Sequence, residues 1–293
     1  MYNDFLQDHY VITTQKHFSY FINTGQFFMR IKYSPKQNMI KNYTLILLLL
    51  LAILSTKAQD STNTNKKFKL LSEFYMMFPN MNGVTGMGTL PEATVDLNPS
   101  DVFSHFKIGA MLYFEVTHDQ WAFTSDLAYM HLKEDVKPGA LINSGEVNVK
   151  QFSWEVAGLR RLLPWFEAGI GGRLNNLNNK LELQTKNVIG GGTTASDKQL
   201  TKTWFDPIIV TRVKGSSGKK FIYQFRGDLG GFGIGSDFAW QLQAYGGWQF
   251  TKGFQLTAGY RIISVDYEKG TGENYFKYDM DTFGPVVKFG FNF

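Results

Sequence analysis

The sequence predicts an all-β protein that crosses a membrane as an antiparallel up-and-down β-barrel of about ten strands. Three observations predict this fold: a signal-like segment near the amino terminus, repeated runs in which every second residue is apolar, and connections that alternate between short and long. The 293 residues include 29 glycines and no cysteine, and 16% of them are aromatic. This composition is typical of a β-rich chain and excludes disulfides and thiolate metal sites.

Residues 39–58 predict a cleavable signal peptide. Lys41 precedes an apolar core, and small residues follow it up to Ala58. The core is shorter than the roughly 20 apolar residues that a membrane-spanning helix needs. We therefore expect cleavage after Ala58 rather than retention as a membrane anchor.

The segments on either side of this signal complete the predicted domain organisation. We expect residues 1–38 to be an upstream extension included by error, with translation starting at Met39; a genuine cytoplasmic extension is the alternative. Residues 59–67 are expected to form a short periplasmic linker. Residues 68–293 are expected to form the transmembrane barrel with its external loops.

The net charge of the chain gives no argument for a nucleic-acid partner. The formal charge is +5, but the first 58 residues hold six of the basic side chains and only two of the acidic ones. Removing them leaves 24 basic and 23 acidic residues. Because the remainder is nearly neutral, the basic isoelectric point does not predict binding to nucleic acid.

The first five strands follow from an apolar alternation with a period of two. In the second run, Phe106, Ile108 and Ala110 fall on one face, and Lys107 and Gly109 fall on the other. Turn-forming residues separate this run from its neighbours. The predicted ranges are 68–79, 103–117, 121–135, 146–161 and 165–181.

The last five strands show the same alternation more sharply. Phe238, Trp240 and Leu242 lie on one face of their run, whereas Gln241 and Gln243 lie on the other. The predicted ranges are 202–213, 221–230, 238–250, 254–267 and 282–293.

The length of the runs separates a membrane barrel from a soluble sandwich. Most runs exceed the five or six residues usual for soluble strands and reach the roughly 9–11 tilted residues that cross a bilayer. Large aromatics at the ends of the apolar faces are typical of the girdles at the two membrane surfaces. These girdle residues are Trp121, Trp165, Tyr223, Trp240, Phe250 and Phe254.

The connections predict which end of the barrel faces the periplasm. Short turns at 118–120, 162–164, 214–220 and 251–253 belong to one end, and longer links at 80–102, 136–145, 182–201, 231–237 and 268–281 belong to the other. The first long link contains Pro99 at a helix-like start, so it could hold an extra hairpin or a short plug helix. Eight and twelve strands therefore remain alternatives to ten.

The inward row of the predicted strands is polar and charged. Six cations and six anions fall on it, and equal numbers of opposite charges in a narrow barrel favour internal pairing over a charge-selective pore. We therefore expect an ion-paired, largely occluded lumen and a structural or surface-interaction role. A narrow channel for ions or small hydrophilic solutes is the alternative. The predicted lumen residues are Lys107, Glu115, Asp126, Glu155, Glu167, Arg173, Asp206, Arg212, Arg226, Asp228, Arg261 and Lys288.

The sequence predicts no enzyme, cofactor or metal site. A lipid hydrolase is a weaker alternative, with His105, Ser153 and Glu155 as the only speculative catalytic set, because no spacing forces a triad. Loop carboxylates of the last external link could bind calcium weakly, but no loop pattern supplies the six to eight oxygens of a firm site. These carboxylates are Asp266, Glu268, Asp279 and Asp281.

Several motifs in the second half of the chain carry a family resemblance. They are Trp204-Phe205-Asp206-Pro207, the glycine-rich stretch from Gly227 to Phe238, and the terminal Phe289-Gly290-Phe291-Asn292-Phe293. With these motifs the chain resembles a largely uncharacterised family of bacterial outer-membrane barrels and, more broadly, the OmpA-type and OmpW-type small barrels.

The resemblance implies a location and partners. It implies the outer membrane of a Gram-negative bacterium, with its lipid and lipopolysaccharide around the barrel. It also implies that Phe289, Phe291 and Phe293 form the signal that the outer-membrane assembly machinery reads. We expect the protein to be a monomer.

Overall fold

The computed structural model describes residues 68–136, 142–186, 193–218 and 220–293. The predictions of an upstream extension, a signal peptide and a periplasmic linker concern residues outside these ranges. Among the described residues, no helix is both long and apolar enough to cross a membrane.

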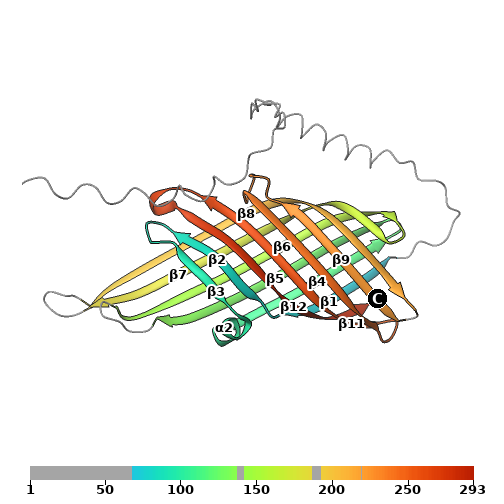
Figure 1. Cartoon of the computed structure of the whole chain (residues 1–293), viewed down its shortest axis with the longest axis horizontal. Coiled ribbons are helices and arrows are strands. Elements are labelled where there is room, and N and C mark those ends of the chain that lie inside the picture. Colours follow the sequence, from blue (N-terminus) through green and yellow to red (C-terminus); the bar gives the residue numbers. More distant parts are fainter. Residues whose placement is uncertain (1–67, 137–141, 187–192, 219) are drawn as a thin grey trace, which may run out of the picture. The chain divides into compact units, whose positions relative to one another are not determined.

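Ten antiparallel strands close into a barrel (Figure 1), and the predicted fold class is confirmed. Neighbours in sequence pair with each other, and β12 pairs with β1 to complete the ring. Where all ten strands lie side by side, closure leaves no free sheet edge, which hydrocarbon would not tolerate. The strands are β1 (Lys69–Met77), β4 (Phe106–His118), β5 (Trp121–Val136), β6 (Ile142–Leu163), β7 (Phe166–Lys186), β8 (Thr193–Ser217), β9 (Phe221–Gly230), β10 (Phe238–Gln249), β11 (Phe254–Lys269) and β12 (Phe276–Asn292).

The first long link contains both features that the sequence left open. β2 (Asn80–Met87) pairs with the external half of β12, β3 (Ala93–Leu97) pairs with β2, and the short helix α2 (Pro99–Ser104) follows. Asn98 caps α2: its side chain accepts from the Asp101 amide at 3.1 Å, and the Asp101 carboxylate accepts from the Asn98 amide at 3.0 Å. The hairpin brings the sheet to twelve strands, of which ten form the closed barrel.

The strands β6, β7, β8 and β12 are longer than predicted. β7 and β8 continue through most of the link expected at 182–201, and most of their paired residues there carry polar side chains. Within this extension the hydroxyl of Thr185 donates to the carbonyl of Thr194 at 3.2 Å. The apolar alternation stops here while the backbone pairing continues, as expected for strand ends that extend beyond the lipid into water.

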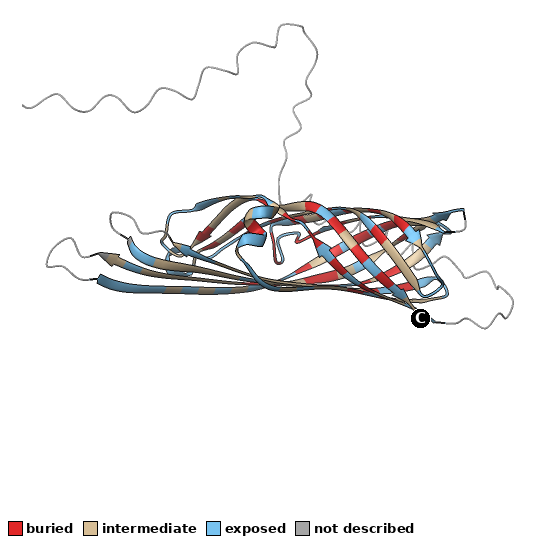
Figure 2. Ribbon diagram, turned by 90° about the horizontal axis from the view of Figure 1, so that it is seen from below, coloured by how far each residue is buried: buried red, intermediate tan, exposed pale blue. Residues whose placement is uncertain are grey.

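The outer face of the barrel is apolar over a continuous belt. Phenylalanine, leucine, isoleucine and tryptophan side chains stand exposed on it, as with Phe123 at 58% and Ile170 at 55% of their full surface. Figure 2 shows buried and exposed residues alternating along the strands in the half of the barrel nearest to the carboxyl terminus. Such a belt around a polar interior is stable in lipid and not in water, so the fold is that of a transmembrane barrel.

Candidate functional site: the barrel lumen

The inward row of side chains forms the candidate site. Eleven of the twelve residues that the sequence assigned to the lumen are buried inside the barrel, which follows from the strict alternation of each strand. They are Glu115, Asp126, Glu155, Glu167, Arg173, Asp206, Arg212, Arg226, Asp228, Arg261 and Lys288.

Lys107 lies elsewhere, exposed at the external start of β4. The register between β4 and β5 shifts between Phe106 and Ile108, which places Lys107 in a β-bulge. Because a bulge inserts one extra residue, the inward and outward parity that holds further along β4 does not extend to Lys107.

Arg212 is the centre of a charge cluster near the end with the short turns, which is the predicted periplasmic end. It donates from Nη1 to Glu115 Oε2 at 2.5 Å and from Nε to Glu167 Oε2 at 2.8 Å. The ammonium of Lys214 lies 2.9 Å from Glu115 and 3.2 Å from Glu167. Since Arg212 comes from β8 and Glu115 from β4, this cluster joins nearly opposite walls of the barrel.

A second cluster lies on Glu155 of β6. Arg173 donates from Nε to Glu155 at 3.0 Å and from Nη2 to Asp228 at 2.7 Å. Arg226 of β9 pairs with the other oxygen of Glu155, and Gln241 of β10 donates to Asp228 at 2.7 Å. The cluster again crosses the lumen, from β6 and β7 to β9 and β10.

A third cluster contains side chains that the sequence analysis had not singled out. Arg261 donates to the hydroxyl of Tyr75 at 2.8 Å and lies 3.2 Å from Asp126, and Tyr75 donates to Asp126 at 2.5 Å. Lys288 pairs with Glu73 at 3.1 Å. Glu73, Tyr75 and Met77 occupy every second position of β1 and therefore lie on the same face of the strand. This alternation could have identified Glu73 and Tyr75 as lumen residues.

Asp206 is held by neutral donors instead of cations. Its carboxylate accepts from the Ser236 amide at 2.6 Å, the Ser236 hydroxyl at 2.9 Å, Asn175 at 3.0 Å and the indole of Trp204 at 3.2 Å. These bonds fasten the link between β9 and β10 against β8. The predicted external loop at 231–237 is therefore pinned to the inner wall at Ser236, which is fully buried.

The external half of the lumen is apolar and aromatic. Trp204 stacks on Tyr267 with ring centroids 4.3 Å apart, and Phe276 and Tyr278 lie against the same indole at 6.4 and 6.2 Å. Val102 of α2 is buried in this cluster. β9 and β10 do not extend as far as this aromatic cluster. Trp204 of β8 therefore packs directly against Tyr267 of β11 and Tyr278 of β12.

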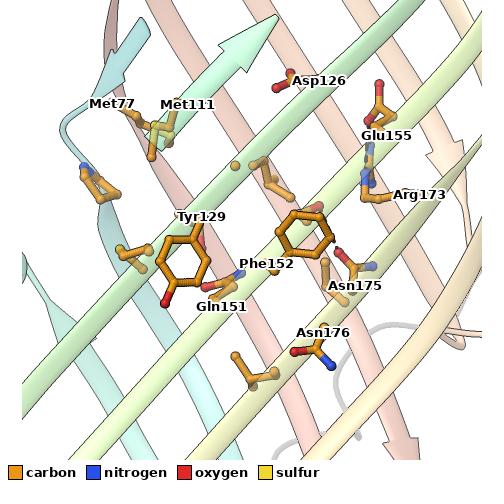
Figure 3. A pocket seen from close by; sticks show the side chains of 18 of the residues that line it. Met77, Met111, Asp126, Tyr129, Gln151, Phe152, Glu155, Arg173, Asn175 and Asn176 are labelled. Atoms are coloured by element: carbon orange, nitrogen blue, oxygen red, sulfur yellow. Dashed lines mark hydrogen bonds and ion pairs between the residues drawn. The ribbon is translucent and has the colours of Figure 1, made fainter. Parts of the chain in front are cut away.

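A cavity lies between the charge clusters and the aromatic side chains (Figure 3). It has a volume of about 90 Å³. Arg173 and Glu155 lie together on one side of it, while Met77 and Met111 lie next to each other on another. The cavity was not predicted from the sequence, because apolar alternation shows which side chains point inward but not how much space they leave between them. Among its lining residues, only Tyr278 and Met280 fall in a link that was predicted as a loop.

The speculative catalytic and calcium sets do not form sites. His105 ends α2 and contacts Glu134 at 3.6 Å, whereas Ser153 donates to Asn175 at 3.0 Å inside the barrel. Within the described ranges, no three histidine, aspartate or glutamate side chains are placed to hold a metal ion.

Comparisons with known proteins give remote similarities. No protein-family model and no curated protein matches the chain. Among solved structures, it is similar to the attachment invasion locus protein Ail of Yersinia pestis, with 10% identity, a TM-score of 0.32, and coverage of 78% of this chain and 99% of that one.

Two further solved structures are similar at the same remote level. A FadL homologue of Pseudomonas aeruginosa has 7% identity and a TM-score of 0.35, with 78% of this chain and 90% of that chain covered. The CymD monoaromatic hydrocarbon channel has 6% identity and a TM-score of 0.33, with 78% and 88% covered. At these identities, no ligand or activity transfers to this chain.

Proposed function

We propose that the protein is a bacterial outer-membrane β-barrel with a structural or surface-interaction role, whose lumen is closed to ions and hydrophilic solutes. The observation that carries this proposal is the set of buried ion pairs that connect opposite walls. Arg212 on β8 reaches Glu115 on β4, and Arg261 on β11 reaches Asp126 on β5. An ion on its way through the barrel would have to separate these pairs.

The apolar belt supports the location. Closed barrels with a lipid-facing apolar band and short turns at one end are typical of the bacterial outer membrane. The lipid and lipopolysaccharide of that membrane would contact exposed side chains such as Phe225, Leu242 and Phe289. The resemblance to OmpA-type and OmpW-type barrels, a monomeric state and recognition by the assembly machinery belong to the same proposal.

Single-channel conductance of the refolded protein in planar lipid bilayers tests the occlusion. We expect no steady openings for the wild type. In a variant with six alanine substitutions, we expect measurable openings, because three buried cations and three buried anions of the first two clusters are replaced by small side chains. The substituted residues are Glu115, Glu155, Glu167, Arg173, Arg212 and Arg226. Leu242→Ala faces lipid and serves as the control that should stay silent.

Other outcomes decide between the alternatives. Steady openings of the wild type that change with Arg226→Ala or Asp228→Ala would contradict the occlusion and indicate a narrow channel. A lipid-modifying activity that disappears in His105→Ala would instead indicate a hydrolase.

A further inference from the structure

We propose that the cavity in the external half of the lumen is a binding site for a small, neutral, mostly apolar molecule that carries one hydrogen-bond acceptor. This inference goes beyond the proposed function, because a closed barrel could hold such a ligand without conducting anything. Three properties of the cavity support it: its walls, one unpaired donor, and the charge balance beneath it.

The walls are apolar and adaptable. Methionine side chains line the cavity from four strands, and the flexible, polarisable thioether adjusts to ligands of different shape. Small-molecule sites are usually concave and lined mainly by apolar and aromatic groups with a few polar ones. The main apolar lining residues are Met77, Met111, Met130, Met280, Leu177 and Trp204.

The charged side of the cavity holds one donor without an acceptor. Arg173 is 3% exposed and uses Nε and Nη2 to bind Glu155 and Asp228. Its Nη1 is buried and has no acceptor among the described residues. A buried donor that stays unpaired is unfavourable, so a ligand that shifts the side chains covering Nη1 and offers it an acceptor atom would gain affinity there. No other residue with such an unpaired buried atom lines the cavity within the described part of the chain.

The charge balance favours a neutral ligand over an anion. The charged side chains that line the cavity already balance each other: Asp126 and Glu155 are anionic, and Arg173 and Arg261 are cationic. A carboxylate ligand would bring a charge without a partner into a poorly solvated site, whereas a carbonyl or hydroxyl oxygen would satisfy Arg173 without adding charge.

Trp204 provides a reporter inside the cavity. It is the only one of the six tryptophans that is buried, at 7% exposure, and the other five lie on the outer face or in a turn. Bromine quenches tryptophan fluorescence at short range, so a bromine-labelled ligand bound in the cavity would quench Trp204. The same compound dissolved in lipid would quench the outer tryptophans without saturation.

The experiment titrates the full refolded protein in lipid nanodiscs with three probes of matched size: 4-bromoacetophenone, 4-bromotoluene and 4-bromobenzoate. We expect saturable quenching by bromoacetophenone, with an affinity about 2- to 10-fold higher than that of bromotoluene, which lacks the acceptor. Bromobenzoate should bind most weakly. The saturable component should disappear in Trp204→Phe.

Three variants localise the binding. Ala128→Leu fills the cavity from β5 and should abolish saturable quenching, whereas Ala258→Leu, which faces lipid, should leave it unchanged. Arg173→Lys keeps the positive charge but removes Nη1, so it should abolish the preference for bromoacetophenone over bromotoluene.

Three results would overturn the proposal. They are the absence of saturable quenching in the wild type, saturable quenching that persists in Trp204→Phe, and tighter binding of the benzoate than of the ketone. None of these results depends on conductance, so the proposal can fail while the occluded barrel stands, and the reverse also holds.

Discussion

Asp206 shows how a single buried carboxylate can organise a segment of this barrel. Four neutral donors surround it, and two of them belong to Ser236 in the link between β9 and β10. Hydrogen bonds to a carboxylate are stronger than those between neutral groups. The link is therefore held against the wall although β9 and β10 themselves have ended.

The variant Asp206→Asn should release this link. The new amide group would face at least one donor, and a buried donor left unpaired costs about 1–3 kcal/mol. We expect a loss of stability of that size in urea unfolding and faster hydrogen exchange at the Ser236 amide.

Asp237→Asn is the matched control, because Asp237 is exposed and pairs with Lys269 at the surface. Its effect should stay below about 1 kcal/mol. Equal effects of the two substitutions would show that the buried carboxylate has no special role.

At the residue scale, the sequence predicted which side chains point inward wherever inward and outward residues alternate regularly along a strand. This alternation alone was enough to assign Arg212 and Glu155 to the lumen. The partners of each charge were not predictable, because Arg212 meets Glu115 across the lumen and not along one strand. Lys107 was wrongly predicted to face the lumen, because the alternation of apolar and polar residues does not reveal the β-bulge at this position.

At the scale of strands, inward glycines allow β10 and β11 to approach closely. A Cβ added to Gly247 would lie 2.1 Å from the carbonyl oxygen of Leu256 on β11. On the lipid side of the same strand, a Cβ added to Gly246 would meet only the ring of Phe221, at 3.4 Å. Strong curvature of a small barrel requires such crowding on the inner face.

Gly247→Ala should therefore destabilise the barrel while Gly246→Ala should not. The first substitution forces the backbone to shift, at a cost of about 1–3 kcal/mol. The second should change stability by less than about 0.5 kcal/mol. Urea unfolding of both variants in lipid vesicles measures the difference, and similar midpoints would contradict the crowding argument.

The hairpin of β2 and β3 is attached to the link between β11 and β12 by a titratable contact. The hydroxyl of Tyr275 donates to Glu92 at 2.7 Å, and Lys277 lies 3.4 Å from the same carboxylate. The hydrogen bond from Tyr275, followed by that from Lys277, holds the pKa of Glu92 below its ordinary value. A lowered pKa in the folded state means that the contact stabilises the hairpin when Glu92 is ionised.

This contact should weaken at acidic pH. Its contribution is fully present above the ordinary glutamate pKa of about 4.3 and is lost as the pH falls through the lowered pKa of the folded state. We expect hydrogen-exchange protection of β2 and β3, corrected for intrinsic rates, to fall between pH 6 and about pH 3.

Glu92→Gln should remove this pH dependence. A loss of protection in the Gln variant that matches the wild type would assign the effect to another group.

The strands were predictable where contact with lipid requires every second residue to be apolar, and less predictable at the strand ends outside the membrane. The alternation gave ten strands and the four short turns, whereas the strand ends above the belt, such as the start of β8 at Thr193, were missed. The outer face of these segments contacts water, so apolar and polar residues no longer alternate. The start of α2 was visible in advance because Pro99 at the first turn leaves a local signal.

At the scale of the whole molecule, β12 completes the barrel. It pairs with β11 along its length, with β1 through its periplasmic half and with β2 through its external half. The aromatic residues Phe289 and Phe291 stand on its lipid face. The strand is thus required for closure whether or not the assembly machinery reads it.

The closed barrel should migrate anomalously on detergent gels. An unheated sample should remain folded and run at a different position from a boiled one, because its ten strands are hydrogen-bonded into a closed ring. A truncation that removes residues 282–293 should lose this heat-modifiable band. Recovery of the full chain as a soluble periplasmic protein would contradict the membrane assignment.

The buried polar contacts of the lumen also constrain how the chain reaches its native state. Arg212 and its partner Glu115 are 97 residues apart, Arg261 and Tyr75 are 186 apart, and Lys288 and Glu73 are 215 apart. Contacts between such distant parts of a chain form late and slowly, because the intervening segment must be ordered first. Lys288 and Glu73 therefore gain each other as partners only when the two ends of the chain meet, so ring closure and the neutralisation of these two charges occur together.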